Sequence, residues 1–168
     1  LRESGVGKGN FYYYFKSKEE LGYAIIDRIR RAFVERGLGP AFADADADPV
    51  DQLHAFFDRV LDSQRQRNCV GGCAMGNLAS ELSDVHEGFR QRLAAVFLAY
   101  RSHLAEAIRR GQQGGRLRPA VDAPRAAQFL VAGLEGAILL GKVTRDITVI
   151  ERCVEELKAH LTLYRNRA

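Results

Sequence analysis

The residues near the start of the chain that could do chemistry carry amines and phenol hydroxyls. They share one short stretch with two glycines: Gly7, Lys8, Gly9, Tyr12, Tyr13, Tyr14 and Lys18. Amines and phenols donate hydrogen bonds to phosphate oxygens, and glycine lets a backbone approach its ligand closely. This stretch therefore predicts a surface that contacts the phosphate backbone of DNA.

Two sequence signals predict the helices that would position these side chains. Phe11 and Phe15 lie four residues apart, so on a helix they share one face and anchor it. The run that begins at Ser17 is a capping box, with Ser17 as the N-cap and Glu20 at the third helical position. A second helix is therefore expected to begin at Lys18. A short helix, a tight turn and a capped longer helix suit a DNA-reading head joined to a body.

The same stretch resembles the recognition-helix signature of TetR-family transcriptional repressors. That signature reads small residue, Lys, Gly, two residues, Tyr, two residues, Phe, and then Lys-Ser/Thr-Lys-Glu-x-Leu. The matching residues are Gly7-Lys8-Gly9, Tyr12, Phe15, Lys16-Ser17-Lys18-Glu19 and Leu21. An amphipathic surface helix with incidental tyrosines is the alternative. Because the family carries two further helices before this point, the resemblance implies that the chain is an N-terminally incomplete version.

Composition fits a globular chain with a basic beginning. Of 168 residues, 46% are hydrophobic and 27% are charged. Residues 1–36 hold eight Lys or Arg and five Asp or Glu, which places +3 of the formal +4 charge there. Between Asp44 and Asp62, six aspartates accompany only Arg59. The basic segment attracts a phosphate backbone, whereas the acidic segment argues against DNA wrapping the whole molecule.

Cysteine content and hydropathy indicate a cytoplasmic protein. The chain has three cysteines and no signal-like beginning, which favours a reducing compartment. Its most apolar run, Phe129–Gly141, is thirteen residues long and contains Glu135. This run is too short to span a bilayer, so we expect no transmembrane segment.

Helical periodicity runs through the rest of the chain. Apolar residues recur every four positions after the capping box: Leu21, Ile25, Ile29 and Phe33. Gly37, Gly39 and Pro40 predict the end of that helix. Further helices are expected from Asp48-Pro49 to about Asn68, over Cys73–Leu82, from Ser83-Asp84 to Gly111 or Gly114-Gly115, from Asp122 and Pro124 through Leu140, and over Thr148–Tyr164. The prediction is an all-α fold: the remnant of a helix-turn-helix DNA-binding head over 1–36, and a helical effector-binding and dimerisation bundle over 37–168.

Two predicted helices carry surfaces on which another helix could pack. Small residues recur every four positions in one, and an apolar stripe follows the other: Gly133, Ala137, Gly141, Ile150, Val154, Leu157 and Leu161. The resemblance implies that these helices pair with their symmetry mates in a four-helix bundle; packing within one chain is the alternative. A two-fold dimer would place two recognition helices on a palindromic DNA site.

Apolar faces of several helices could line a pocket for a small effector, as the resemblance implies. The candidate residues are Phe57, Val60, Leu61, Cys73, Met75, Leu78, Phe97, Tyr100, His103, Leu134 and Glu135. For each apolar member taken alone, plain core packing is the favoured alternative. Glu135 lies in the most apolar helix, where an unpaired carboxylate is costly, so it needs a partner. Arg101, His103 and Lys142 are candidates, unless Glu135 faces the cavity or the dimer axis.

The cysteines offer a second chemistry. Cys69 and Cys73 are two potential ligands, and no neighbouring residue completes a zinc site. A thiol near the pocket could sense oxidants or electrophiles if a cation lowered its pKa, and Cys73–Leu78 resembles a Gly-Cys-x-x-Gly-Asn-Leu segment of repressors that do so. A small buried hydrophobic role is the favoured alternative.

The predicted function is a ligand-responsive transcriptional repressor. It would bind double-stranded operator DNA as a homodimer and leave it when a small-molecule effector binds. No catalytic, phosphate-loop or metal motif is present, so we expect no enzyme, no cofactor and no membrane partner. The alternatives are a thiol-sensing repressor and a helical small-molecule-binding domain that does not bind DNA.

The phosphate-contact hypothesis predicts the behaviour of a Lys8→Ala variant. Removing one phosphate contact should weaken binding to all DNA sequences and make the salt dependence of binding shallower. A mobility-shift titration at several salt concentrations measures both. Unchanged operator affinity in the full-length variant would contradict the role given to Lys8.

Overall fold

The computed structural model describes residues 5, 7–44 and 46–166, and over these residues the chain is helical. The helices are α1 (Lys8–Tyr14), α2 (Lys18–Phe33), a π-helical segment η1 (Val34–Leu38), α3 (Gly39–Ala41), α4 (Pro49–Gln66), α5 (Ala74–Leu82), α6 (Glu87–Gln113), α7 (Ala123–Thr144) and α8 (Ile147–Thr162). Within the described residues, β pairing is limited to one isolated bridge between Leu117 and Arg165. The predicted all-α class is confirmed.

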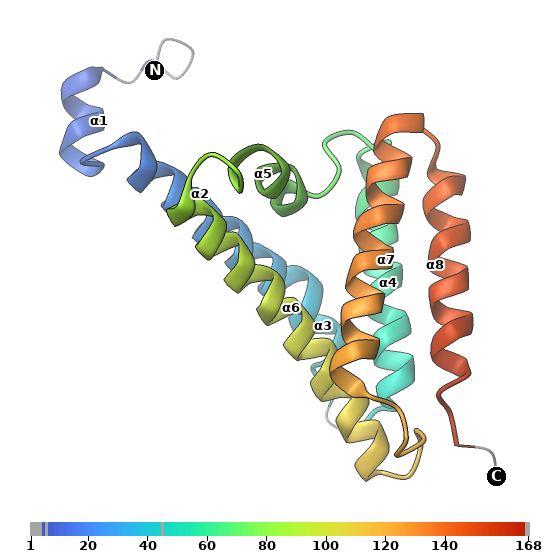
Figure 1. Cartoon of the computed structure of the whole chain (residues 1–168). Helices are drawn as coiled ribbons and strands as arrows, with labels where there is room; N and C mark the ends of the chain where they lie inside the picture. The colour runs from blue at the N-terminus through green and yellow to red at the C-terminus, as the bar shows by residue number, and fades with distance from the viewer. Residues whose placement is uncertain (1–4, 6, 45, 167–168) are drawn as a thin grey trace.

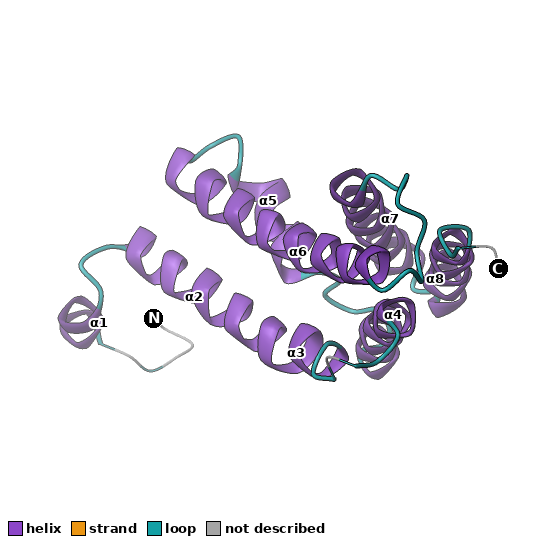
Figure 2. Ribbon diagram, turned by 90° about the horizontal axis from the view of Figure 1, so that it is seen from below, coloured by secondary structure: helices purple, strands orange, loops and turns teal. Residues whose placement is uncertain are grey.

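The helices form an elongated molecule with α1 at one end. Figure 1 shows α2 running beside α6, and α4, α7 and α8 packed together at the far end. In the view from below, α2 and α6 lie alongside each other and α1 projects beyond the start of α2 (Figure 2). α2 is thus the connection between the short first helix and the bundle.

Side-chain caps fix several helix starts where the sequence predicts them. The Ser17 hydroxyl accepts a hydrogen bond from the Glu20 backbone N–H at 3.1 Å, which begins α2 at Lys18. Asp48 caps α4 through the Val50 N–H at 2.8 Å, with Pro49 at the first helical position. These caps satisfy N–H groups that have no partner inside the helix.

Two predicted boundaries are wrong. Gly37 does not end the second helix, because the chain continues through η1 and α3 to Ala41. Ser83 does not begin the long helix but ends α5, and α6 begins at Glu87. The cap of α6 is His86, whose Nδ1 accepts from the Phe89 N–H at 3.4 Å. Histidine is an uncommon N-cap, so the Ser-Asp pair upstream gave the stronger but misleading signal.

The predicted dimer residues are occupied inside the chain. A Cβ atom on Gly133 would lie 2.8 Å from Leu157, and one on Gly141 would overlap Ile150. Ala137, Val154 and the other members of that set are buried: Ile150, Leu157 and Leu161. The small-residue groove of α7 therefore receives the apolar stripe of α8 from the same chain. This corrects the expectation that these seven residues face a second copy.

α7 is also longer than the apolar run in the sequence. At 22 residues, Ala123–Thr144 is long and apolar enough to cross a membrane by length and composition alone. A single such helix is weak evidence, since the central helix of a bundle has the same composition. In this structure α7 packs against α6 and α8.

The contact between α7 and α8 predicts the effect of a Gly141→Ala substitution. Ile150 is fully buried and cannot move aside, so the added methyl group should lower the free energy of unfolding by about 1–3 kcal/mol. Urea denaturation measures this change. Gly114→Ala is the control, because a Cβ there meets only ordinary contact and should change stability by less than about 0.5 kcal/mol. Equal effects of the two substitutions would contradict the packing.

Candidate functional site

The candidate DNA-binding surface is the outer face of α1. Tyr12, Tyr13 and Tyr14 are 57%, 80% and 68% exposed. On the opposite side, the rings of Phe11 and Phe15 lie 5.9 Å apart and are partly buried. Exposed phenols on an anchored helix are what the sequence predicts.

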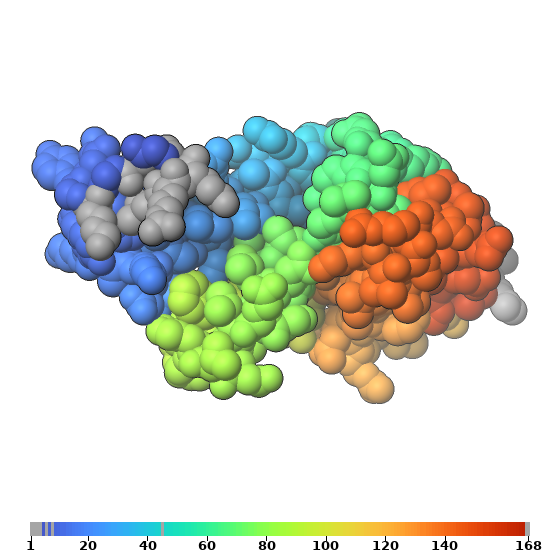
Figure 3. All heavy atoms as spheres, turned by 90° about the horizontal axis from the view of Figure 1, so that it is seen from above, coloured from blue at the N-terminus to red at the C-terminus, as the bar shows by residue number. Residues whose placement is uncertain are grey.

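The remaining residues of the predicted DNA surface lie around these tyrosines. Gly7 precedes α1 in an extended conformation, and Gly9 and Lys18 are exposed. Lys8 begins α1, but its side chain lies outside the described part of the structure. Figure 3 shows this N-terminal segment in blue at one end of the molecule, away from α7 and α8 in orange and red.

α2 is held against α6 by close aromatic packing. Tyr23 packs on Phe89 with ring centroids 4.9 Å apart, and the Arg92 guanidinium lies 4.1 Å from the centroid of the Tyr23 ring. A Cβ atom on Gly22 would lie 2.6 Å or less from the Phe89 ring, so this approach requires glycine. A cation over a ring adds attraction to the apolar contact. The start of α2 is therefore tied to α6 by direct side-chain contact.

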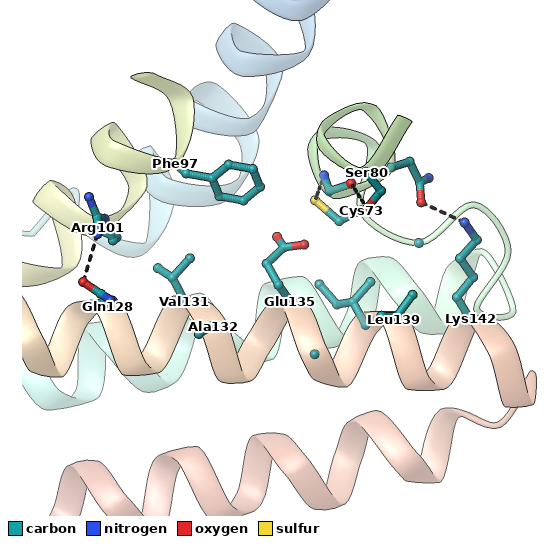
Figure 4. Close-up of a pocket in the computed structure, with 15 residues that line it drawn as sticks. Cys73, Ser80, Phe97, Arg101, Gln128, Val131, Ala132, Glu135, Leu139 and Lys142 are labelled. Carbon is teal, nitrogen blue, oxygen red and sulfur yellow. Dashed lines mark hydrogen bonds between the residues drawn. The ribbon is translucent and has the colours of Figure 1, made fainter. Parts of the chain in front are cut away.

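Two pockets lie between the helices of the body. The α2-side pocket, of about 430 Å³, is lined by residues of α2, η1, α4, the loop before α5, α6 and α7. The α5-side pocket, of about 450 Å³, lies between α5, α6 and α7 (Figure 4). Both volumes fall in the range of small-molecule sites. The pockets share five wall residues: Gly72, Cys73, Val131, Glu135 and Ile138.

The shared wall is built around Glu135 and Cys73. Figure 4 shows Glu135 pointing from α7 into the space between Phe97 of α6 and the start of α5. A Cβ atom on Gly76 would lie 2.7 Å from the Glu135 carboxylate, so glycine at this position allows the carboxylate to approach α5. The Cys73 sulfur accepts from the Gly76 N–H at 3.4 Å, and the Cys73 thiol lies beside the Glu135 carboxyl in the shared wall.

This environment disfavours charge on both groups. Burial raises the pKa of the Glu135 carboxyl. Burial first, and the neighbouring Glu135 second, raise the pKa of the Cys73 thiol to about 12. Burial likewise raises the pKa of Tyr100, which lines the α2-side pocket. A thiol with a raised pKa is a poor nucleophile at neutral pH.

The structure brings most of the predicted pocket residues together. Val60, Met75, Tyr100 and Leu134 line the α2-side pocket, Phe97 lines the α5-side pocket, and Cys73 and Glu135 line both. Phe57 and Leu61 are buried in the core outside the pocket walls, and Leu78 packs against the core.

The three candidate partners for Glu135 have other hydrogen-bond partners. His103 is exposed and bonds to the Ala99 carbonyl at 2.8 Å, which corrects its assignment to the pocket. Arg101 donates to Gln128 at 3.0 Å, and Lys142 donates to Asn77 at 2.7 Å. Glu135 faces the cavity, which was the other expectation for it, with the Cys73 thiol beside it.

Several pocket residues escaped the sequence prediction. Arg36 and Gly37 lie at the expected end of the second helix, Arg59 and Gln64 lie on α4, and Arg67 caps its C-terminus. No sequence signal marked them as pocket residues, because arginine and glutamine on a helix are ordinarily surface residues. Within the described residues, no group of three or more His, Cys, Asp or Glu could hold a metal ion.

Comparison with known proteins gives consistent matches over most of the chain. Residues 49–157 match the family model described as "Tetracyclin repressor-like, C-terminal domain". The chain is 33% identical to an uncharacterised HTH-type transcriptional regulator of Lactococcus lactis, over 94% of this chain and 78% of that protein. It is 27% identical to the HTH-type transcriptional repressor NemR of Escherichia coli, over 94% of this chain and 79% of NemR.

Solved structures agree with these matches. The crystal structure of a regulatory protein TetR from Rhodobacter sphaeroides superposes with a TM-score of 0.85 and 29% identity, covering 95% of this chain and 84% of that one. The reduced form of E. coli NemR gives a TM-score of 0.84 and 27% identity, covering 100% and 84%.

The environment of Cys73 predicts a slow reaction with electrophiles. With Cys69→Ser and Cys153→Ser in place, the rate of Cys73 alkylation by iodoacetamide should keep rising with pH beyond about 10, because only the thiolate reacts. Adding Glu135→Gln should lower the apparent pKa, since it removes the second cause of the shift. Mass spectrometry follows the alkylation rates. The reference is a cysteine peptide, whose thiol has a pKa of about 8.5. A plateau for Cys73 below about pH 9.5 would contradict the burial argument.

Proposed function

The chain belongs to the TetR family of helix-turn-helix transcriptional regulators, and from this premise we propose that it is a ligand-responsive repressor of operator DNA. The observation that carries the proposal is the course of α2. This helix begins four residues after Tyr14, the last exposed tyrosine of α1, and ends, through η1, in the wall of the α2-side pocket. One continuous helical element therefore joins a DNA-contacting surface to a ligand-sized cavity. Regulators of this family are not enzymes, in agreement with the sequence prediction.

In this proposal α1 is the recognition helix. Lys8, Tyr12 and Tyr13 contact phosphates, while Gly7, Gly9, Tyr14 and Lys18 lie close to the DNA. Support comes from the exposed phenols of α1 and from the cap that fixes the start of α2. We place the protein in the cytoplasm, where it meets DNA.

The effector acts from the pocket on α2. Phe33, near the end of α2, lies 4.3 Å from the Tyr100 ring of α6, and both line the α2-side pocket. A ligand that pushes these rings apart shifts the end of α2, and the α2–α6 contact carries the shift to α1. The two DNA-binding heads can take a DNA-bound or a released arrangement. The ligand shifts the balance between these two arrangements by binding one of them more tightly than the other.

A homodimer supplies the second head. Apolar side chains along one side of α7 remain exposed: Phe129, whose ring also lies 4.8 Å from the His160 ring of α8, is 49%, Leu140 is 52% and Val143 is 74% exposed. Ala132 and Gly136 continue this face between Phe129 and Leu140 at helical spacing. An exposed apolar stripe of this kind is typical of a helix-pairing interface. We propose that it replaces the buried α7–α8 residues as the dimer surface.

A mobility shift with the DNA upstream of the protein's own gene tests DNA binding. The complete protein should retard this DNA at low salt without effector. If no retardation occurs under these conditions, the alternative of a helical ligand-binding domain that does not bind DNA is favoured.

The proposed dimer surface predicts the effect of a Leu140→Lys/Val143→Lys double variant. Two buried charges should split the dimer, so light scattering should report a monomer and operator affinity should fall by about tenfold or more. Leu98→Lys is the control, because Leu98 is 55% exposed but lies on α6. A double variant that remains dimeric would remove α7 from the interface.

Reversible ligand binding is favoured over thiol sensing. Cys73 lies in both pocket walls, but its raised pKa works against the thiolate that such chemistry needs. Cys69→Ser and Cys73→Ser variants should therefore still respond to the inducer.

A further inference from the structure

Three arginines line the α2-side pocket and are exposed at its mouth. Arg36 comes from η1, and Arg59 and Arg67 come from α4 and its C-cap. Among the described residues, Arg36 and Arg59 have no side-chain hydrogen bond or ion pair, and Arg67 donates only to the Ser63 carbonyl at 3.1 Å. Water screens these cations from one another, but their donors are available to an anion that enters the pocket.

The same wall offers almost no negative charge to balance these cations. Glu135 is the only acidic residue among the described residues that line the pocket. It lies on α7 beside Cys73, in the wall shared with the α5-side pocket, and burial raises the pKa of its carboxyl. The pocket therefore has a net positive lining.

A buried carboxamide in this wall lacks a partner. Gln64 is 2% exposed, lines the α2-side pocket, and its Oε1 atom has no hydrogen-bond partner in the described structure. A buried polar group without a partner is costly and uncommon in a folded protein. A half-turn of the terminal amide presents either its oxygen or its NH2 group. Gln64 is thus ready to bond a hydroxyl or a carboxylate of a ligand.

The rest of the pocket is apolar. Its walls carry aliphatic and aromatic side chains from four helices: Ile29, Phe33, Phe56, Met75, Leu134 and Ile138. At about 430 Å³, the pocket accepts a small molecule with a hydrophobic body. A cationic wall beside an apolar cavity matches a molecule with one charged end.

We propose that the α2-side pocket binds an amphipathic anion, with its carboxylate or phosphate held by Arg36, Arg59 and Arg67. The anionic end also hydrogen-bonds to Gln64, and the apolar body packs among the aliphatic and aromatic walls. Arginine suits this role because its planar fork of donors matches the oxygens of a carboxylate or a phosphate.

This assignment rests on the proposed function for its regulatory meaning and names the chemical class of the effector. Arg36 lies on the continuation of α2, whereas Arg59 and Arg67 lie on α4. An anion held by both elements ties the end of α2 to α4. The charged end of the ligand, and not only its bulk, then sets the position of the recognition helix.

Calorimetric titration of the complete protein with four ten-carbon probes tests the assignment. The probes are decanoate, decyl phosphate, decan-1-ol and decyltrimethylammonium, each below its micellar concentration. Decanoate or decyl phosphate should bind at least tenfold more tightly than decan-1-ol, and decyltrimethylammonium should bind least. The tighter of the two anions identifies whether the natural head group is a carboxylate or a phosphate.

Variants separate a binding role from a structural one. Arg36→Gln/Arg59→Gln should weaken anion binding at least tenfold and leave decan-1-ol binding unchanged, whereas Arg31→Gln, on the exposed part of α2, should change neither. Gln64→Leu should weaken anion binding but raise the unfolding temperature of the free protein, because it removes an unpartnered buried group.

Three results would overturn the assignment: no binding of either anion, equal affinity for decanoate and decan-1-ol, or wild-type anion affinity in the arginine double variant. The mobility shift distinguishes this failure from failure of the proposed function. A retarded DNA with no anion binding removes the ligand class and keeps the repressor. Arginine-dependent anion binding that leaves DNA binding unchanged keeps the ligand class and removes its role as effector.

Discussion

The packing of α2 against α6 is the constraint on which the rest of the structure depends. Gly22 lets the Phe89 ring lie against α2, and Tyr23 fills the adjacent space beneath the Arg92 guanidinium. Farther along, Phe33 meets Tyr100 where the α2-side pocket begins. Aromatic contacts therefore join α2 to α6 both near its start and at its end. In the proposed mechanism, a ligand that separates Phe33 from Tyr100 changes this packing and so the position of α1.

Local signals in the sequence were sufficient for the head and for most of the helices. The spacing of Phe11 and Phe15, the Ser17 cap and the Asp48-Pro49 start each act over a few residues, so they could be interpreted without knowledge of the fold. The predicted helix boundaries were wrong where the structure departs from the usual capping and termination of α-helices. Gly37 lies in a π-helical segment, and His86 takes the cap expected of Ser83. π-helical turns are frequent at functional sites, and η1 does line the pocket.

Tertiary placement could not be obtained in the same way. The repeat of Gly133 and Gly141 correctly indicated close helix packing, but a repeat does not say whether the partner helix belongs to the same chain. The charge of the pocket was hidden for a similar reason, because Arg36 and Arg59 come from different elements and each resembles an ordinary surface residue in its own helix. For Glu135 the sequence left open a cationic partner and a place facing the cavity, and the structure places it in the cavity wall beside the Cys73 thiol.

The pocket walls contain groups that a core built only for stability would avoid. Glu135 and Cys73 lose solvation in the wall that the two pockets share, and in the described structure Gln64 leaves a buried oxygen without a partner in the wall of the α2-side pocket. Replacing any of them by an apolar residue of similar size would relieve that cost. Such polar groups destabilise the empty protein, and a ligand that enters the cavity and forms hydrogen bonds with them removes this cost. The relief of this cost favours the ligand-bound state over the empty state. Because Arg36 lies in the same wall, a ligand that binds it would also hold the end of α2.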